Sequence, residues 1–122
     1  MMGADWVRLR NMSFYGYHGV SAAEQEIGRR LLVEVELALD LSRAGASDEL
    51  ADTVDYGQVY AVVAEVNASR RFSLLEALAE EIARRLLASF PVGEVRVRVR
   101  KPDPPVGGVV EEVEVEITRR KG

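Results

Sequence analysis

The sequence predicts an α+β domain in which a four-stranded antiparallel sheet carries two helices on one face. Four stretches alternate apolar and charged residues with a period of two, as half-buried strands do. Two stretches between them repeat their apolar residues at helical spacing. The last two strands carry opposite charges, arginine on one and glutamate on the other, as an antiparallel pair favours. The predicted order is therefore β-β-α-α-β-β.

The first half of the chain supplies two strands. Val7 and Leu9 alternate with arginines in a short first strand, and a glycine-punctuated segment, 14–19, then leads into a polar stretch that ends at Gly28. The second strand is long and has its apolar residues in one phase and its acidic residues in the other, as a half-buried antiparallel strand requires. The apolar phase comprises Leu31, Val33, Val35, Leu37, Leu39 and Leu41, and the acidic phase Glu34, Glu36 and Asp40.

Two helices follow, separated by a break at 67–72. Asp55 is placed to cap the first helix, whose apolar stripe consists of Val59, Val62, Val63 and Val66. Ser73 and Glu76 have the spacing of a capping box at the start of the second helix. Its apolar face consists of Leu75, Leu78, Ala79, Ile82 and Leu86, and Pro91 and Gly93 end it.

The last two strands are predicted to form a hairpin. The third runs over 94–101, and the fourth carries Val113, Val115 and Ile117 in one phase. In the predicted pairing Arg96, Arg98 and Arg100 face Glu116, Glu114 and Glu112, with each pair contributing roughly 0.2–1 kcal/mol. Both strands then present valines to the helices and a charged ladder to the opposite face.

The predicted sheet has two open edges, which natural proteins pair, cover or blunt. A ring of subunits that continues the sheet into a barrel would pair the edges and enclose the charged ladders in a wet interior. We therefore expect a symmetric oligomer, although a charged face also fits a solvated monomer.

Composition narrows the classes of function. The chain of 122 residues fits one domain, 1–122, and its net charge of −4 argues against nucleic-acid binding. One histidine and no cysteine argue against a structural zinc site, and no cofactor or metal is expected. The sequence lacks a membrane-spanning run and a secretory signal, so we expect no membrane partner and a cytoplasmic location.

Lys101 is the most informative single residue. Of 16 basic residues only Lys101 and Lys121 are lysines, and Lys101 ends the apolar phase of the third strand. A partly desolvated lysine can release its proton near neutral pH, whereas arginine cannot. The structural alternative is a lysine that extends from a strand end to solvent.

Other polar residues also have structural interpretations. His18 fits a hydrogen-bonded turn, Glu24 a solvated carboxylate, and Tyr56 an aromatic side chain in a first helical turn. Glu76 fits the acidic position of a capping box, where the helix dipole favours it.

Five runs nevertheless stand out in order along the chain: Phe14-Tyr15-Gly16-Tyr17-His18-Gly19, Glu24-Gln25-Glu26-Ile27-Gly28, Asp52-Thr53-Val54-Asp55-Tyr56-Gly57, Leu74-Leu75-Glu76 with Leu78-Ala79-Glu80, and Lys101-Pro102. With these runs the chain resembles the dihydroneopterin aldolases of folate biosynthesis, across about Trp6 to Arg119. The resemblance implies the tunnelling fold, whose element order agrees with the prediction above. It also implies homo-tetrameric rings, which can stack into octamers and form ring-shaped barrels, with active sites between subunits.

The resemblance implies a retro-aldol cleavage of 7,8-dihydroneopterin into 6-hydroxymethyl-7,8-dihydropterin and glycolaldehyde. The C=N bond of the pterin accepts the electrons, so neither a metal nor a lysine Schiff base is needed. The catalytic residues would be Lys101 as general acid–base, Tyr56 for proton transfer to or from the intermediate, and Glu24 near the substrate side chain. The substrate-binding residues would be Glu76, which grips the pterin N–H donors, with Val54, Leu75 and Val20.

Two alternatives remain open at this point. A dihydroneopterin triphosphate epimerase would use the same scaffold and would need a basic cluster near the pocket, for which Arg70 and Arg71 are candidates. A non-catalytic pterin-binding ring protein would bind without turnover and would not need Lys101 or Tyr56.

Overall fold

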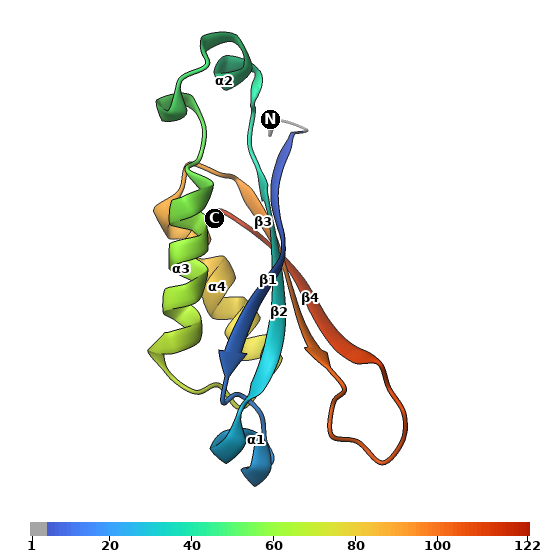
Figure 1. Cartoon of the computed structure of the whole chain (residues 1–122). Coiled ribbons are helices and arrows are strands. Elements are labelled where there is room, and N and C mark those ends of the chain that lie inside the picture. Colours follow the sequence, from blue (N-terminus) through green and yellow to red (C-terminus); the bar gives the residue numbers. More distant parts are fainter. Residues whose placement is uncertain (1–4) are drawn as a thin grey trace.

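The protein forms a four-stranded antiparallel sheet with two long helices on one face (Figure 1). The structure, a computed structural model, describes residues 5–122, so the first four residues of the predicted domain lie outside the described part. The strands lie in sequence order: β1 (Trp6–Gly16), β2 (Arg29–Ala38), β3 (Glu94–Pro102) and β4 (Glu112–Arg120). The predicted fold class is thereby confirmed.

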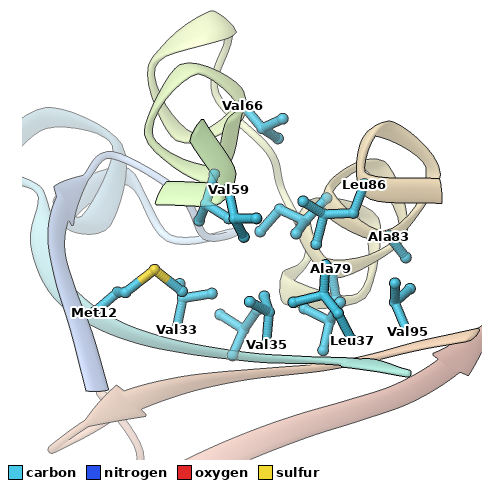
Figure 2. Close-up of a cluster of buried hydrophobic side chains, with 14 of the residues drawn as sticks. Met12, Val33, Val35, Leu37, Val59, Val66, Ala79, Ala83, Leu86 and Val95 are labelled. Atoms are coloured by element: carbon cyan, nitrogen blue, oxygen red, sulfur yellow. The ribbon is translucent and has the colours of Figure 1, made fainter. Parts of the chain in front are cut away.

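The helix-covered face of the sheet holds the core. The long helices are α3 (Tyr56–Ser69) and α4 (Leu75–Ser89), and both present apolar stripes to the strands. Figure 2 shows Val59 and Val66 of α3 and Ala79 and Leu86 of α4 above strand side chains that include Val35. Leu78 and Ile82, both fully buried, complete the helix side of this core. The predicted stripes of both helices therefore face the core, and of their residues only Val62 is partly buried.

β1 extends farther than its alternation suggests. Leu9 pairs with Val35 and Met12 with Val33, so two residues, Arg10 and Asn11, oppose one position of β2. This bulge moves the inward phase of β1 from odd to even residues, and Asn11 adopts a positive φ of 52° there. The sequence prediction ended the strand too early because a phase change looks like the end of a strand.

Three short helices were not predicted. They are α1 (Ala22–Ile27), α2 (Ser42–Ser47) and the 3₁₀ helix η1 (Leu50–Asp52), the last two lying between β2 and α3. The second strand also ends at Ala38, before the predicted Leu39 and Leu41. Helices this short bury too few side chains to leave a periodic signal in the sequence.

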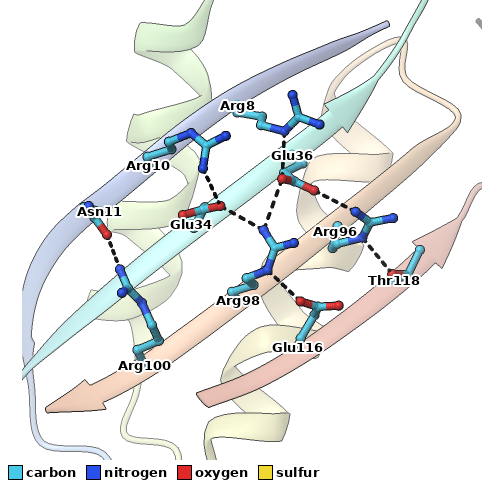
Figure 3. A network of polar contacts seen from close by, with 10 residues as sticks. All are labelled: Arg8, Arg10, Asn11, Glu34, Glu36, Arg96, Arg98, Arg100, Glu116 and Thr118. Atoms are coloured by element: carbon cyan, nitrogen blue, oxygen red, sulfur yellow. Dashed lines mark hydrogen bonds and ion pairs between the residues drawn. The ribbon is translucent and has the colours of Figure 1, made fainter. Parts of the chain in front are cut away.

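The other face of the sheet carries the predicted charged ladders (Figure 3). The predicted register is wrong by two residues, because Arg98 lies opposite Glu116 and Arg100 opposite Glu114, and Arg96 pairs with Thr118. A shift of two leaves every side chain on its predicted face. The network also reaches β2, since Arg98 contacts both Glu34 at 2.8 Å and Glu36 at 3.1 Å.

The two predicted helix caps have different outcomes. Asp55 caps α3, and its Oδ1 accepts a hydrogen bond from the Gly57 N–H at 2.9 Å. The predicted Ser73–Glu76 capping box is wrong, since Leu74 occupies the N-cap of α4 and makes no side-chain cap bond. α4 begins one residue later than a Ser73 cap requires.

Asp55→Ala should therefore lower the free energy of unfolding by about 1 kcal/mol, the usual contribution of an N-cap. Ser73→Ala, the matched control, should change it by less than about 0.5 kcal/mol. Urea unfolding at equal protein concentration measures both. A larger loss for Ser73→Ala than for Asp55→Ala would contradict the described helix starts.

Candidate active site

Lys101 lies at the end of β3 with only 7% of its surface exposed, on the same face as the buried Val99. Its Nζ donates a hydrogen bond to Oε2 of Glu24, from an element 77 residues earlier in the chain. The interpretation of Lys101 as a lysine extended into solvent is thus wrong. A buried amine is instead held in an ion pair with a buried carboxylate.

Glu24 is held in place by the first turn of α1. Ser21 Oγ accepts a hydrogen bond from the Glu24 N–H at 3.1 Å, and Glu24 Oε1 accepts from the Ser21 N–H and hydroxyl. This is a capping box, found at Ser21 rather than at Ser73. Burial alone would raise the pKa of the Glu24 carboxyl, but the hydrogen bonds from Lys101 and Ser21 outweigh it and lower the pKa. Glu24 is therefore a fixed anion rather than one of several solvated carboxylates.

Two further residues hold the backbone or side chain around the Lys101–Glu24 pair. Gly19 lies against the Glu24 carboxylate at a φ of +138°, and a methyl group added to it would lie 2.4 Å from Oε1. Arg29 NH1 donates to the carbonyl of Pro102 at 3.1 Å, so it holds the chain directly after Lys101. A cavity beside Glu24 is lined by Ser21, Ala23, Glu24, Ile27, Gly28, Arg29 and Pro105.

Gly19→Ala should lower the free energy of unfolding by roughly 1–3 kcal/mol, because the alanine must both adopt a strained backbone and displace a buried carboxylate. Gly45→Ala is the matched control, since a methyl group at Gly45 has no atom within 4 Å. It lies inside α2 and should leave stability unchanged or raise it by up to about 1 kcal/mol. Thermal unfolding of both variants tests the contact, and equal effects would refute it.

Glu76 and Leu75 lie at the start of α4. Glu76 is exposed in the first helical turn, whereas Leu75 has only 8% of its surface exposed and packs in the core. The preceding Phe72 joins this helix start to the Glu24 region, because its carbonyl accepts a hydrogen bond from the Gly19 N–H at 3.0 Å. Glu76 is therefore tethered to the same end of the molecule as Lys101 and Glu24.

Tyr56 and Val54 lie elsewhere. Tyr56 begins α3 and is 71% exposed, whereas Val54 is 3% exposed and packs in the core. Asn67, in the last turn of α3, bonds to His18, whose neighbour Gly19 lies against the Glu24 carboxylate. The 14 residues of α3 span roughly 20 Å at 1.5 Å per residue. Tyr56 and Lys101 of one chain are thus at opposite ends of the helix layer. Val20 is 72% exposed beside Gly19.

Sequence reasoning missed Ser21, Gly19 and Arg29 as parts of this site. The Ser21–Glu24 spacing is a capping-box signal that was legible in the sequence. No local pattern shows that Gly19 packs on a carboxylate or that Arg29 reaches the carbonyl of Pro102. Within residues 5–122, no group of three or more His, Asp or Glu side chains is arranged to hold a metal ion.

Comparison with known proteins gives one family. The family model described as dihydroneopterin aldolase matches residues 7–118. The dihydroneopterin aldolase of Bacillus subtilis is 43% identical over 118 residues, which cover 96% of this chain and 98% of the relative.

Solved structures agree with the sequence comparison. The Escherichia coli dihydroneopterin aldolase in complex with neopterin superposes with a TM-score of 0.87 at 34% identity, covering 94% of this chain and 98% of that one. A Burkholderia dihydroneopterin aldolase bound to guanine gives a TM-score of 0.80 at 32% identity, covering 97% and 92%. With the matching family model and the 43% identical relative, these similarities show that the chain belongs to the dihydroneopterin aldolase family.

Proposed function

We propose that this protein is a dihydroneopterin aldolase, which cleaves 7,8-dihydroneopterin into 6-hydroxymethyl-7,8-dihydropterin and glycolaldehyde. The observation that carries the proposal is the buried Lys101–Glu24 pair, in a chain whose residues 7–118 match this family. Two relatives were solved with neopterin and with guanine, and both ligands contain an aminopyrimidinone ring. The exposed carboxylate of Glu76 suits the amino and ring N–H donors of such a ring, as a bidentate acceptor.

The reaction requires one proton to leave the 2′-hydroxyl as the bond between C1′ and C2′ breaks. The electrons of that bond move into the C=N bond of the pterin, and the resulting intermediate takes a proton at carbon to give the hydroxymethyl product. Lys101 is the group assigned to the hydroxyl proton, because a lysine amine can serve as a general acid–base group, whereas arginine cannot. Glu24 holds the amine at one position, so that it need not be reoriented in each turnover.

Tyr56 is assigned to proton transfer at the intermediate, which places it in the same site as Lys101. The length of α3 separates the two residues of one chain, so the site requires Tyr56 of a neighbouring copy. We therefore propose a homo-oligomer, a ring of four or two stacked rings, with active sites between subunits. The free outer edges of β1 and β4 support this, since ring closure would pair them.

Mixing two inactive variants tests the shared site. Lys101→Ala and Tyr56→Phe should each lower turnover strongly on their own. Mixed oligomers contain sites with Lys101 from one variant and Tyr56 from the other, so dissociation and reassociation of an equal mixture should restore about a quarter of wild-type activity. Mixing without dissociation is the control. If mass spectrometry shows mixed assemblies and activity does not recover, Lys101 and Tyr56 of each site must come from the same chain.

The direct test of function is to incubate the purified protein with 7,8-dihydroneopterin and measure glycolaldehyde. Stoichiometric release of glycolaldehyde is expected. Formation of the 2′-epimer without glycolaldehyde would instead show an epimerase, and binding without turnover would show a non-catalytic pterin-binding protein.

Within residues 5–122 no helix is long and apolar enough to cross a membrane, and the cytoplasmic location stays a prediction.

A further inference from the structure

His18 is the only histidine of the chain, and 2% of its surface is exposed. Its Nδ1 accepts a hydrogen bond from the Phe72 N–H, and its Nε2 bonds to Oδ1 of Asn67, each at 2.9 Å. The same Asn67 donates from Nδ2 to the carbonyl of Tyr15 at 3.2 Å. Both nitrogens of a buried imidazole are therefore engaged by groups on other parts of the chain.

These partners fix the protonation of the ring. The Phe72 N–H can only donate, so Nδ1 carries no proton. Because the amide nitrogen of Asn67 donates to Tyr15, its oxygen faces Nε2, and Nε2 carries the proton. His18 is thus neutral, in the Nε2–H form.

The ring joins the two parts of the candidate site. Gly19, next to His18, donates its N–H to the carbonyl of Phe72 and forms the wall against which the Glu24 carboxylate packs. Phe72 leads in four residues to Glu76, the proposed pterin anchor. We propose that neutral His18 is a positioning residue that sets the distance from the Glu24–Lys101 pair to Glu76, an inference that rests on the proposed function. We name the contacts among His18, Gly19, Asn67 and Phe72 the His18 clasp.

A proton on Nδ1 would oppose the Phe72 N–H and open the His18 clasp. Burial lowers the pKa of His18 below its usual 6.5, and the positive charges of Lys101 on β3 and Arg70 after α3 lower it further, although the Asn67 bond raises it. Glu24 on α1 is the acidic group of this region, and it is paired with Lys101. A folded-state pKa below the unfolded value means that the stability from this histidine is present above about pH 6.5 and is lost as the pH falls.

The first test uses the fact that the chain has one histidine, so imidazole signals need no assignment. Long-range ¹H–¹⁵N spectra of ¹⁵N-histidine protein should show the Nε2–H form and a titration midpoint below pH 6.5. An Nδ1–H form, or ordinary titration near 6.5, would overturn the His18 clasp whatever the protein catalyses. Conversely, if the spectra show the clasp and the protein releases no glycolaldehyde, the His18 clasp stands and the proposed function is refuted.

The second test separates positioning from stability. His18→Phe keeps a buried ring without either hydrogen bond, and should lower kcat at least tenfold while the Kd for the pterin product changes less than threefold. His18→Asn can restore an acceptor for the Phe72 N–H and should recover kcat to within about threefold of wild type.

Val95→Ala is the control for lost stability, because Val95 is fully buried near the opposite end of β3 from Lys101. It should keep kcat near the wild-type value at temperatures where it stays folded and assembled. Wild-type kcat in folded His18→Phe, or equal losses in His18→Asn and His18→Phe, would overturn the positioning role.

Discussion

Lys101→Ala is expected to lower kcat for dihydroneopterin cleavage by two to four orders of magnitude, about what a general acid–base group contributes. The expectation follows from the position of this amine, buried at the end of β3 in contact with Glu24. Affinity for the pterin should change much less, because the proposed anchor of the ring is Glu76 and not Lys101. Single-turnover kinetics and fluorescence titration measure the two effects separately.

Loss of Lys101 also leaves the Glu24 carboxylate buried without its partner, which can cost about 3–5 kcal/mol of stability. Lys101→Arg separates the two effects, because arginine keeps the positive charge for Glu24 but does not release a proton near neutral pH. Lys121→Ala, a change at the other lysine of the chain, is the control and should retain full activity. Turnover by Lys101→Arg within tenfold of wild type would rule out the proton-transfer role.

Glu36→Gln is expected to lower the free energy of unfolding by about 3 kcal/mol, the largest stability effect on the charged face. Glu36 is 4% exposed and holds three arginines, with Arg8 at 2.8 Å, Arg96 at 3.0 Å and Arg98 at 3.1 Å (Figure 3). Without the negative charge Arg8 and Arg96 lose their ion-pair partner, and Arg98 keeps only its pairs with Glu34 and Glu116. Urea unfolding at pH 7 measures the loss.

The loss of stability caused by Glu36→Gln should become smaller at low pH. Burial alone would raise the pKa of the Glu36 carboxyl, but the hydrogen bonds from Arg8 and Arg98 outweigh it and lower the pKa below its usual 4.5. The stabilisation is therefore complete above about pH 4.5 and disappears as the pH falls through the lowered value. If the free energies of unfolding of variant and wild type still differ by the same amount when the pH has fallen below the lowered pKa of Glu36, the negative charge assigned to Glu36 is contradicted.

Glu80→Gln is the matched control for this prediction. Glu80 pairs with Arg119 at 2.8 Å, but both side chains are about half exposed, 53% and 43%. Such a pair contributes only about 0–1 kcal/mol. A loss as large as that of Glu36→Gln would mean that burial does not set the strength of these pairs.

Periodicity was enough to predict the fold wherever a segment buries one face over several residues. β2, β3, α3 and α4 meet this condition, and each was located from its apolar phase. The edge strand β4 was located from the same alternation, although its Val115 and Ile117 are only partly buried. The continuation of β1 was missed because the bulge at Arg10 and Asn11 reverses the phase within a single strand. The β3–β4 register was missed because a two-residue shift preserves the faces and still places Arg98 and Arg100 opposite glutamates, although Arg96 then lies opposite Thr118.

Lys101 and Glu24 could be named from the sequence, but their arrangement could not. Lys101 stood out by its phase and rarity, whereas its contact with Glu24 joins elements 77 residues apart. Ser73 and Ser21 both precede a glutamate by three residues, and only the actual helix start decides which serine caps. The separation of Tyr56 from Lys101 depends on the direction in which α3 runs over the sheet.

The scarcity of lysine makes this protein unusually simple to footprint. A reagent that acylates amines has only two side-chain targets, one buried beside Glu24 and the other, Lys121, exposed near the C-terminus. Mass measurement of proteolytic peptides can then follow the two modifications separately, with Lys121 as an internal standard of reactivity. Shielding of Lys101 by an added pterin would report occupancy of the pocket directly, without an enzymatic assay.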